Sequence, residues 1–271
     1  MLKYDIETMK RIIFALLLLM PLAALCAKAD EKKIDVRCMV RHVECKDSVT
    51  YGEGVAKVSY DCDLPVMGEA AVVKGVLGWI MPLLVDEDVM ATFSVDAGST
   101  RENIEDALES QVKNYLEQDY PDLKEMNTDA DYPICMDHLY EVKVAYEDAQ
   151  RITFLVTAYF YGGGAHGSTF IAGATFSKAD GHRLKISELL PGYTTVQVRA
   201  ELRRGLRQYF GVKTDQQLKQ ELQVDHLNMQ NFPLPDTDPW LDADGVQFLY
   251  QQYEIACYAA GMPNVTIKPR K

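Results

Sequence analysis

The sequence predicts an α+β fold in which antiparallel sheets are packed by several helices and form two intimately associated halves. Strand-like segments occur in consecutive runs joined by turn signals such as Asp180-Gly181, which is typical of antiparallel hairpins. Helical periodicity is confined to segments between these runs and does not alternate with single strands. That arrangement favours an α+β over an α/β architecture.

The first predicted half, residues 30–138, begins with a hairpin. Ile34–Glu44 and Val55–Cys62 have the composition of strands and are joined across Thr50–Gly54. An apolar helix is expected after Pro65.

A second helix is expected to begin at Ser99, whose side chain would cap it, with Glu102 completing the capping box. Its end is predicted at Pro121, because proline disrupts the interior of a helix. The stripe predicted to face the core has helical spacing and consists of Ile104, Leu108, Val112 and Leu116.

The second predicted half, residues 139–271, begins with an antiparallel meander over residues 139–187. Its expected strands are Tyr140–Tyr146, Ile152–Tyr161, Thr169–Phe176 and, after the Asp180-Gly181 turn, Arg183–Ile186. An irregular stretch is expected over Asn231–Asp242, because prolines interrupt it. The remaining predicted helices are Val196–Phe210 and a short one after it that Thr214 and Gln217 cap. The remaining predicted strands lie around Val246–Tyr250 and Val265–Ile267.

Residues 1–29 are predicted to be a signal peptide that is removed from the mature protein. Lys10 and Arg11 precede an apolar run over Ile12–Leu25, which is too short to span a bilayer comfortably. Ala27-Lys-Ala29 is a small-x-small cleavage site, so cleavage is expected after Ala29.

The alternative is a lipoprotein acylated at Cys26, although Leu25 immediately before it is unsuited to that processing. Either route takes the protein to the periplasm or the cell surface. No later segment is long and apolar enough to predict a transmembrane helix in the mature chain.

The chain is strongly acidic, with a formal net charge of −12. Loss of residues 1–29 would remove four basic and two acidic residues and give −14. A protein with this charge repels nucleic acid and attracts cationic partners over about a Debye length. No nucleic-acid partner is therefore predicted, and the oligomeric state is left open.

Five cysteines lie beyond the signal peptide, namely Cys38, Cys45, Cys62, Cys135 and Cys257. An oxidising compartment favours pairing, and the odd number leaves at least one thiol free. A disulfide joining Cys62 to Cys38 or to Cys45 is predicted, because these residues lie on adjacent strand-like segments. No C-x-x-C spacing occurs, so neither a metal site nor a cofactor is predicted.

The most distinctive segment is Tyr159–Gly167, in which aromatic residues run into three consecutive glycines and His166. It lacks the lysine and hydroxyl of a phosphate-binding loop, and no helical pattern follows it. On a structural interpretation, the glycines allow a tight bend with His166 buried and hydrogen-bonded. On a functional interpretation, bare backbone amides and His166 line a groove for a ligand or partner.

Two blocks of sequence occur in a characteristic order, Tyr161–Gly167 followed by the Asp-Gly turn, and Phe248–Gly261 followed by Val265–Ile267. Together they resemble the RsiV-like extracellular domain family (domain of unknown function 3298), over residues 150–271. Cys257 departs from the family pattern, which commonly has proline there.

Residues 34–125 resemble in pattern the companion N-terminal half (4163-type) found with this family, mainly through Asp63-Leu-Pro65. The resemblance implies an extracytoplasmic domain that occurs in lysozyme-sensing anti-sigma factors and in cell-wall deacetylases. We therefore expect an exported, non-enzymatic binding module of the cell envelope. Its expected partner is a protein, with a cationic, lysozyme-like one as the leading case, or a cell-wall glycan.

The candidate binding residues lie in the two blocks, where tyrosine offers an apolar body and a polar tip. They are Tyr161, Gly163, Gly164, His166, Tyr250, Tyr253, Glu254 and Tyr258. The alternative function is an envelope glycan or peptidoglycan hydrolase in which His166 and Glu254 converge as a base and its orienting partner. No nucleophile motif frames the nearby hydroxyls, so catalytic residues are assigned only under this alternative.

Overall fold

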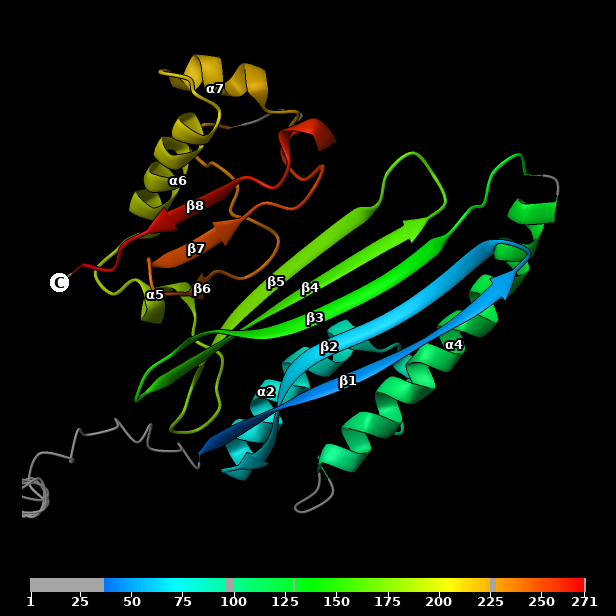
Figure 1. Ribbon diagram of the computed structural model, residues 1–271. Helices are drawn as coiled ribbons and strands as arrows, with labels where there is room; N and C mark the ends of the chain where they lie inside the picture. Colours follow the sequence, from blue (N-terminus) through cyan, green and yellow to red (C-terminus); the bar gives the residue numbers. More distant parts are fainter. Residues whose placement is uncertain (1–36, 96–99, 129, 225–227, 271) are drawn as a thin grey trace, which may run out of the picture. The chain divides into compact units, whose positions relative to one another are not determined.

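The computed structural model describes residues 37–95, 100–128, 130–224 and 228–270 (Figure 1). The predicted signal peptide, its cleavage site at Ala29 and the alternative acylation site at Cys26 lie outside these residues, as does the predicted cap at Ser99. Of the helices in the described ranges, none combines the length and apolar character needed to cross a membrane.

Two sheets and their covering helices confirm the predicted α+β fold. The larger sheet consists, in spatial order, of β1 (Cys38–Tyr51), β2 (Gly54–Gly68), β3 (Met136–Glu147), β4 (Arg151–Gly162) and β5 (Ser168–Ser177). The smaller, antiparallel sheet consists of β6 (Trp240–Leu241), β7 (Val246–Leu249) and β8 (Asn264–Ile267). The helices are α2 (Ala70–Leu84), α3 (Glu87–Met90), α4 (Thr100–Thr128), α5 (Ile186–Leu189), α6 (Thr195–Tyr209) and α7 (Asp215–Glu221).

The larger sheet is mixed, which corrects the expectation of purely antiparallel sheets. Strands β2 and β3 run parallel, with Tyr60 opposite Tyr140. A parallel pair needs a long crossover connection, and here α2, α3 and α4 provide it. The other neighbours in this sheet are antiparallel, so the predicted meander is confirmed for β3, β4 and β5.

Helices α2 and α4 lie on one face of the larger sheet and enclose the main core with it (Figure 1). The predicted stripe of α4 is confirmed as part of this core, since Ile104, Leu108, Val112 and Leu116 are all buried. Tyr60 and Tyr140 stack across the parallel pair with ring centroids 4.6 Å apart. The opposite face of β2 and β3 carries charges, and Lys143 Nζ lies 2.7 Å from Asp61 Oδ1.

The prediction that α4 ends at Pro121 is wrong, because the helix continues to Thr128. Proline removes one backbone donor, which costs a hydrogen bond but does not stop a helix that is held by tertiary packing. Leu123 in the following turn is fully buried and joins the main core. Burial of that side chain offsets the lost hydrogen bond.

The Asp180-Gly181 turn is present, with Gly181 at φ 76° and the Ser177 amide donating to the His182 carbonyl at 3.0 Å. The predicted return strand from Arg183 to Ile186 is wrong. Only one bridge, between Phe176 and Arg183, continues the pairing. Helix α5 then begins at Ile186, because Glu188 accepts the backbone amide of Lys185 at 2.9 Å in a capping box.

The predicted boundary between the halves, between residues 138 and 139, falls inside β3. That strand pairs with β2 on one side and with β4 on the other, so strands from both predicted halves share one sheet. The division stays a prediction about folding units.

Among the described residues, Cys45, Cys62, Cys135 and Cys257 have free thiols, so the predicted disulfide of Cys62 is not formed. The register gives the reason, because Cys62 lies opposite Val43 and Cys45 lies opposite Tyr60. Diagonal neighbours are about 7–8 Å apart, whereas a disulfide needs Cβ atoms about 4 Å apart, and Cys38 lies farther still. Burial raises the pKa of the Cys62 thiol to about 12.

The turn between β3 and β4 is organised by Asp148. Its Oδ1 accepts the backbone amides of Gln150 and Arg151 at 2.8 and 2.7 Å. Its Oδ2 accepts the Arg151 guanidinium at 2.6 Å and the Tyr146 hydroxyl at 2.9 Å. Although partial burial opposes them, these hydrogen bonds lower the pKa of Asp148 from 3.8 to about 2.

We predict that Asp148→Asn lowers the free energy of unfolding at pH 7 by about 1–2 kcal/mol. The folded-state pKa lies below the unfolded value, so this contribution is present above pH 3.8 and is lost as pH falls through about 2. Urea unfolding at neutral pH and near pH 2 measures it, and the difference from wild type should shrink in acid. Asp131→Asn, at an exposed position, is the control. A difference that does not change with pH would contradict the assignment.

Candidate functional site

The glycine segment forms the bend between β4 and β5, as the structural interpretation expected. Gly163 has φ 80°, and a Cβ atom there would lie 2.5 Å from Ile134 Cγ2. At Gly167 a Cβ atom would overlap the ring of Tyr159, whereas Gly164 faces open space. Glycine is therefore required at 163 and 167 by conformation or by close packing.

His166 is exposed, which contradicts the burial expected on the structural interpretation. Its ring stacks on Tyr258 with centroids 4.0 Å apart and an interplanar angle of 20°. Its Nδ1 lies 3.0 Å from the Gly167 carbonyl, to which the Tyr258 hydroxyl donates at 3.1 Å. Tyr253 joins the group, with its hydroxyl 3.5 Å from His166 Nε2. We call His166, Tyr253 and Tyr258 the aromatic cluster.

The aromatic cluster brings together the two sequence blocks, which lie far apart in the chain. Tyr253 is 61% exposed and has φ 64°, a conformation that is uncommon for a residue with a large side chain. Its ring lies 5.8 Å from that of Tyr258. The structure therefore presents two tyrosines and a histidine at the surface, at some backbone cost.

Glu254 does not join the aromatic cluster. Its Oε1 accepts the Asp236 amide at 2.9 Å and its Oε2 accepts the Gln251 amide at 2.6 Å. Burial raises the pKa of this carboxyl, although the two backbone hydrogen bonds oppose the shift. No hydrogen bond joins Glu254 to His166, so the carboxylate fixes two loops in place.

The other predicted binding residues have mainly structural contacts. Tyr250 is fully buried, and its hydroxyl donates to the Pro233 carbonyl at 2.9 Å. Its side chain therefore cannot contact a binding partner. Tyr161 donates to the Gly164 carbonyl at 3.0 Å and closes the bend. Of the predicted set, His166, Tyr253 and Tyr258 are therefore the residues that form a surface.

Two residues that sequence reasoning missed, Gln251 and Gln252, seal the outer edge of β5. Gln251 accepts the Ile171 amide at 3.1 Å and donates to the Ile171 carbonyl at 2.7 Å. Gln252 accepts the Thr169 amide at 2.9 Å. Side-chain amides thus replace a neighbouring strand and join β5 to the second sequence block. The signal in the sequence is the pair of adjacent glutamines inside the second block.

We predict that Gln251→Met lowers the free energy of unfolding by about 2 kcal/mol, because both backbone groups of Ile171 lose their partner. Gln252→Met should cost less, since it removes a single hydrogen bond at Thr169. Urea unfolding measures the loss, and hydrogen exchange should accelerate at Ile171 in the first variant. Equal effects of the two variants would contradict this role.

The C-terminal sheet also contacts β5 directly. The Leu241 amide donates to Thr175 Oγ1 at 2.9 Å, and the Trp240 ring lies where a side chain at residue 173 would be. Gly173 is therefore needed for close packing, and β5 connects the two sheets.

Comparison with known proteins gives a family match for the C-terminal part. Residues 193–269 match the family model described as Protein of unknown function (DUF3298). The DUF3298 match includes the second sequence block, and thus Tyr253 and Tyr258 of the aromatic cluster. No curated protein matches the chain in sequence.

Solved structures of DUF3298 proteins share the fold over most of the chain. A family member from Bacteroides fragilis matches with a TM-score of 0.66 at 16% identity, covering 87% of this chain and 92% of that one. A family protein from Pseudomonas aeruginosa PAO1 matches with a TM-score of 0.54 at 15% identity, with the same coverage of 87% and 92%. At these identities the likeness is one of fold.

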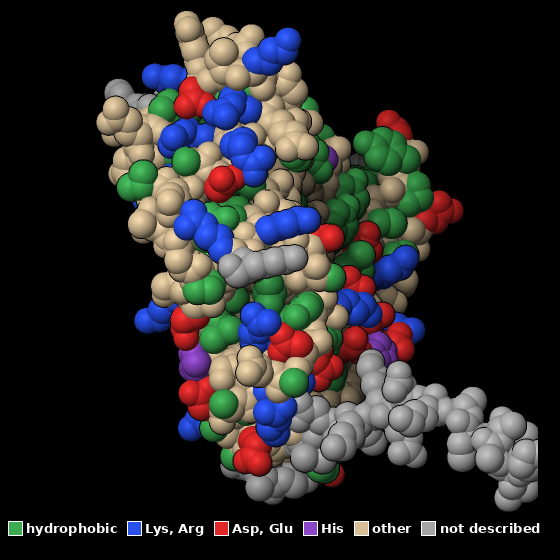
Figure 2. Space-filling view, turned by 90° about the vertical axis from the view of Figure 1, so that its left-hand side faces the viewer, with side chains coloured by type: hydrophobic (Ala, Val, Ile, Leu, Met, Phe, Trp, Pro, Cys, Tyr) green, Lys and Arg blue, Asp and Glu red, His purple; other side chains and the backbone are tan. Residues whose placement is uncertain are grey.

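Charge is unevenly distributed over the described surface. Helix α6 carries four arginines and one glutamate. Lys and Arg side chains gather in the upper part of Figure 2, where this helix lies. Helix α4 carries eight acidic and three basic residues. Among the described residues, no group of three His, Cys, Asp or Glu side chains is arranged to hold a metal ion.

Proposed function

We propose that this protein is an exported, non-enzymatic binding module of the cell envelope, with the aromatic cluster as its contact surface. The observation that carries the proposal is the exposed placement of Tyr253 beside His166 and Tyr258. The signal peptide over residues 1–29, the RsiV-like relationship and the 4163-type identity of the N-terminal half are parts of the same proposal.

The chemistry of the aromatic cluster suits recognition. Tyrosine contributes large contact area with few rotatable bonds, and it is enriched among the residues that dominate binding energy. Tyr258 is held by the His166 ring and by the Gly167 carbonyl. A surface that is already ordered loses little entropy when a partner binds.

The proposed partner is a protein, with a cationic, lysozyme-like protein as the leading case, or a cell-wall glycan. The net charge of −12 supports a cationic protein through long-range attraction. The exposed tyrosine rings support a glycan, because sugar rings stack on aromatic faces as apolar surfaces do.

Calorimetric titration at low and moderate salt tests the proposal, with lysozyme in one arm and soluble peptidoglycan fragments in the other. We expect one of them to bind, and Tyr258→Ala and Tyr253→Ala each to weaken it about tenfold. Tyr132→Ala is the control, since this residue is 71% exposed and lies outside the aromatic cluster. Absence of binding in both arms at both salt concentrations would remove the proposal.

The hydrolase alternative, with His166 and Glu254 as the catalytic pair, stays a prediction without geometric support. Both oxygens of Glu254 accept backbone amides, and neither is hydrogen-bonded to His166. It requires turnover of muropeptides that is lost in His166→Ala at an unchanged melting temperature. The hydrolase alternative would be supported if wild type turns over muropeptides and His166→Ala does not.

A further inference from the structure

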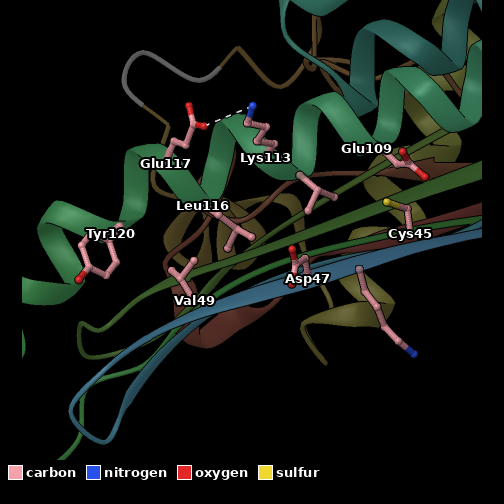
Figure 3. A pocket seen from close by; sticks show the side chains of 10 residues that line it. Cys45, Asp47, Val49, Glu109, Lys113, Leu116, Glu117 and Tyr120 are labelled. Carbon is pink, nitrogen blue, oxygen red and sulfur yellow. Dashed lines mark ion pairs between the residues drawn. The ribbon is translucent and has the colours of Figure 1, made fainter.

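A groove runs between the edge strand β1 and helix α4 (Figure 3), and no residue of the aromatic cluster lines it. Its volume is about 690 Å³. Cys45, Asp47 and Val49 line it from β1, and Glu109, Val112, Lys113, Leu116, Glu117 and Tyr120 line it from α4. In Figure 3, Leu116 of α4 points toward Val49 and Asp47 of β1, whereas Lys113 and Glu117 point away from the strand.

The β1 side of the groove is an edge of the larger sheet. Among the described residues, β1 pairs with β2 alone. At the opposite edge of the same sheet, Gln251 and Gln252 occupy the backbone groups of β5. An edge strand without such a cover can accept an extended peptide as an additional strand.

The dimensions and floor of the groove suit a short extended segment. Residues 45–49 of β1 span about 14 Å at strand spacing. Residues 109–120 of α4 span about 16 Å at helical spacing, so the two walls match in length. Val49, Leu116 and Tyr120 give the floor an apolar strip, and Tyr120 is 42% exposed. This strip would receive every second side chain of a strand.

The charges around the floor of the groove determine which charge on a bound peptide is favoured. Lys113 Nζ lies 3.7 Å from Glu117 Oε1, so these two residues neutralise each other. Among the described residues, neither Asp47 nor Glu109 forms an ion pair. Both lie close enough to the half-buried thiol of Cys45 that, together with burial, their charges raise its pKa. Lys46 also lines the groove, but its ammonium is paired with Glu44 at 2.6 Å. Two uncompensated carboxylates therefore remain beside the apolar strip.

We propose that this groove binds an extended, basic peptide segment as a sixth strand beside β1, with apolar side chains on Val49 and Tyr120 and a basic side chain between Asp47 and Glu109. The backbone of the segment pairs with the free edge of β1 and supplies affinity. The side chains supply selectivity for basic over acidic sequences. This site is distinct from the aromatic cluster, so the two can be tested separately.

The test uses short, labelled synthetic peptides in which valine alternates with lysine or with glutamate, titrated by fluorescence anisotropy. The lysine peptide should bind, more weakly as salt rises, and the glutamate peptide should not. Hydrogen exchange of the β1 amides should slow on binding, because they gain partners, while exchange of β8 amides stays unchanged.

The variant Asp47→Asn/Glu109→Gln should weaken binding of the lysine peptide about tenfold. The matched control Glu125→Gln/Glu221→Gln removes the same charge at exposed positions outside the groove. Tyr258→Ala should also leave peptide binding unchanged. Equal binding of both peptides, equal effects of the two double variants, or no slowing of β1 exchange would each overturn the proposal.

A second copy of the chain is the competing occupant of this edge. If a second copy binds there, hydrogen exchange of the β1 amides should depend on protein concentration in the absence of peptide. Light scattering should then give twice the mass of the monomer. That result would also overturn the peptide proposal. A monomer whose β1 amides slow only when the lysine peptide is added supports it.

Discussion

Gly181→Ala is expected to lower the free energy of unfolding by about 3 kcal/mol, because two separate costs coincide at this residue. Gly181 has φ 76°, a conformation that disfavours any side chain. A Cβ atom there would also overlap the carbonyl of Ala71 in the first turn of α2. That obstacle is backbone, which cannot rotate away.

Two matched variants separate these costs. Gly192→Ala places alanine at φ 79° with nothing nearby, so it should cost only about 1 kcal/mol. Gly75→Ala lies in helix α2, where alanine normally stabilises by about 1 kcal/mol. It should destabilise here, because its Cβ atom would overlap the carbonyl of Gly181.

Urea unfolding of the three variants measures the difference. The expected order of stability loss is Gly181→Ala first, with Gly75→Ala and Gly192→Ala clearly smaller. A Gly75→Ala variant that is more stable than wild type would contradict the close approach of α2 to this turn.

The second large effect is expected at the buried pair of Asp119 on α4 and His138 on β3. Asp119 Oδ2 lies 2.9 Å from His138 Nε2, with side-chain exposures of 11% and 10%. Neither atom has another hydrogen-bond partner in the described part of the chain. Burial raises the pKa of Asp119, which the neighbouring His138 opposes. Each side chain thus offsets the cost of burying the other.

Asp119→Leu is expected to cost about 3 kcal/mol, because it leaves the His138 nitrogen buried without a partner. His138→Phe should cost a similar amount by stranding the carboxyl group. The double variant should be more stable than either single one, since it leaves no unpaired polar atom. The new phenyl ring would also lie between Tyr115 and Phe160, whose rings are 4.4 and 4.8 Å from that of His138.

A double-mutant cycle from urea unfolding checks this, and the coupling energy should exceed about 2 kcal/mol. Strictly additive losses would show that the two side chains act independently. The pair fixes α4 to β3, which is the first strand of the meander.

Local signals in the sequence were sufficient wherever one element's pattern decides its conformation. The stripe Ile104–Leu116 predicted the buried side of α4, and Thr214 with Gln217 predicted the cap of α7, which forms both hydrogen bonds of a capping box. The glycines of Tyr159–Gly167 predicted a bend. Pro121 misled because the packing of Leu123, a tertiary contact, outweighed a local preference.

The candidate site could be predicted only in part, because its residues converge from distant segments. The sequence blocks predict both His166 and Tyr258 as binding residues. Only the fold shows that their rings stack, with centroids 4.0 Å apart. Tyr250 and Glu254 were selected from the same block. The fold uses one as buried core and the other to hold backbone amides. Side-chain direction in an irregular loop has no fixed period, so the sequence could not assign it.

By itself the sequence determined the α+β class, the positions of most helices and strands, and the acidic character of the chain. Those features depend on short-range periodicity, capping and composition. Only the tertiary structure decided that β2 and β3 are parallel and that Gln251 and Gln252 seal β5. It also decided that the groove lies between β1 and α4. These features depend on contacts between residues far apart in the chain, and no local pattern records which distant segment becomes a neighbour.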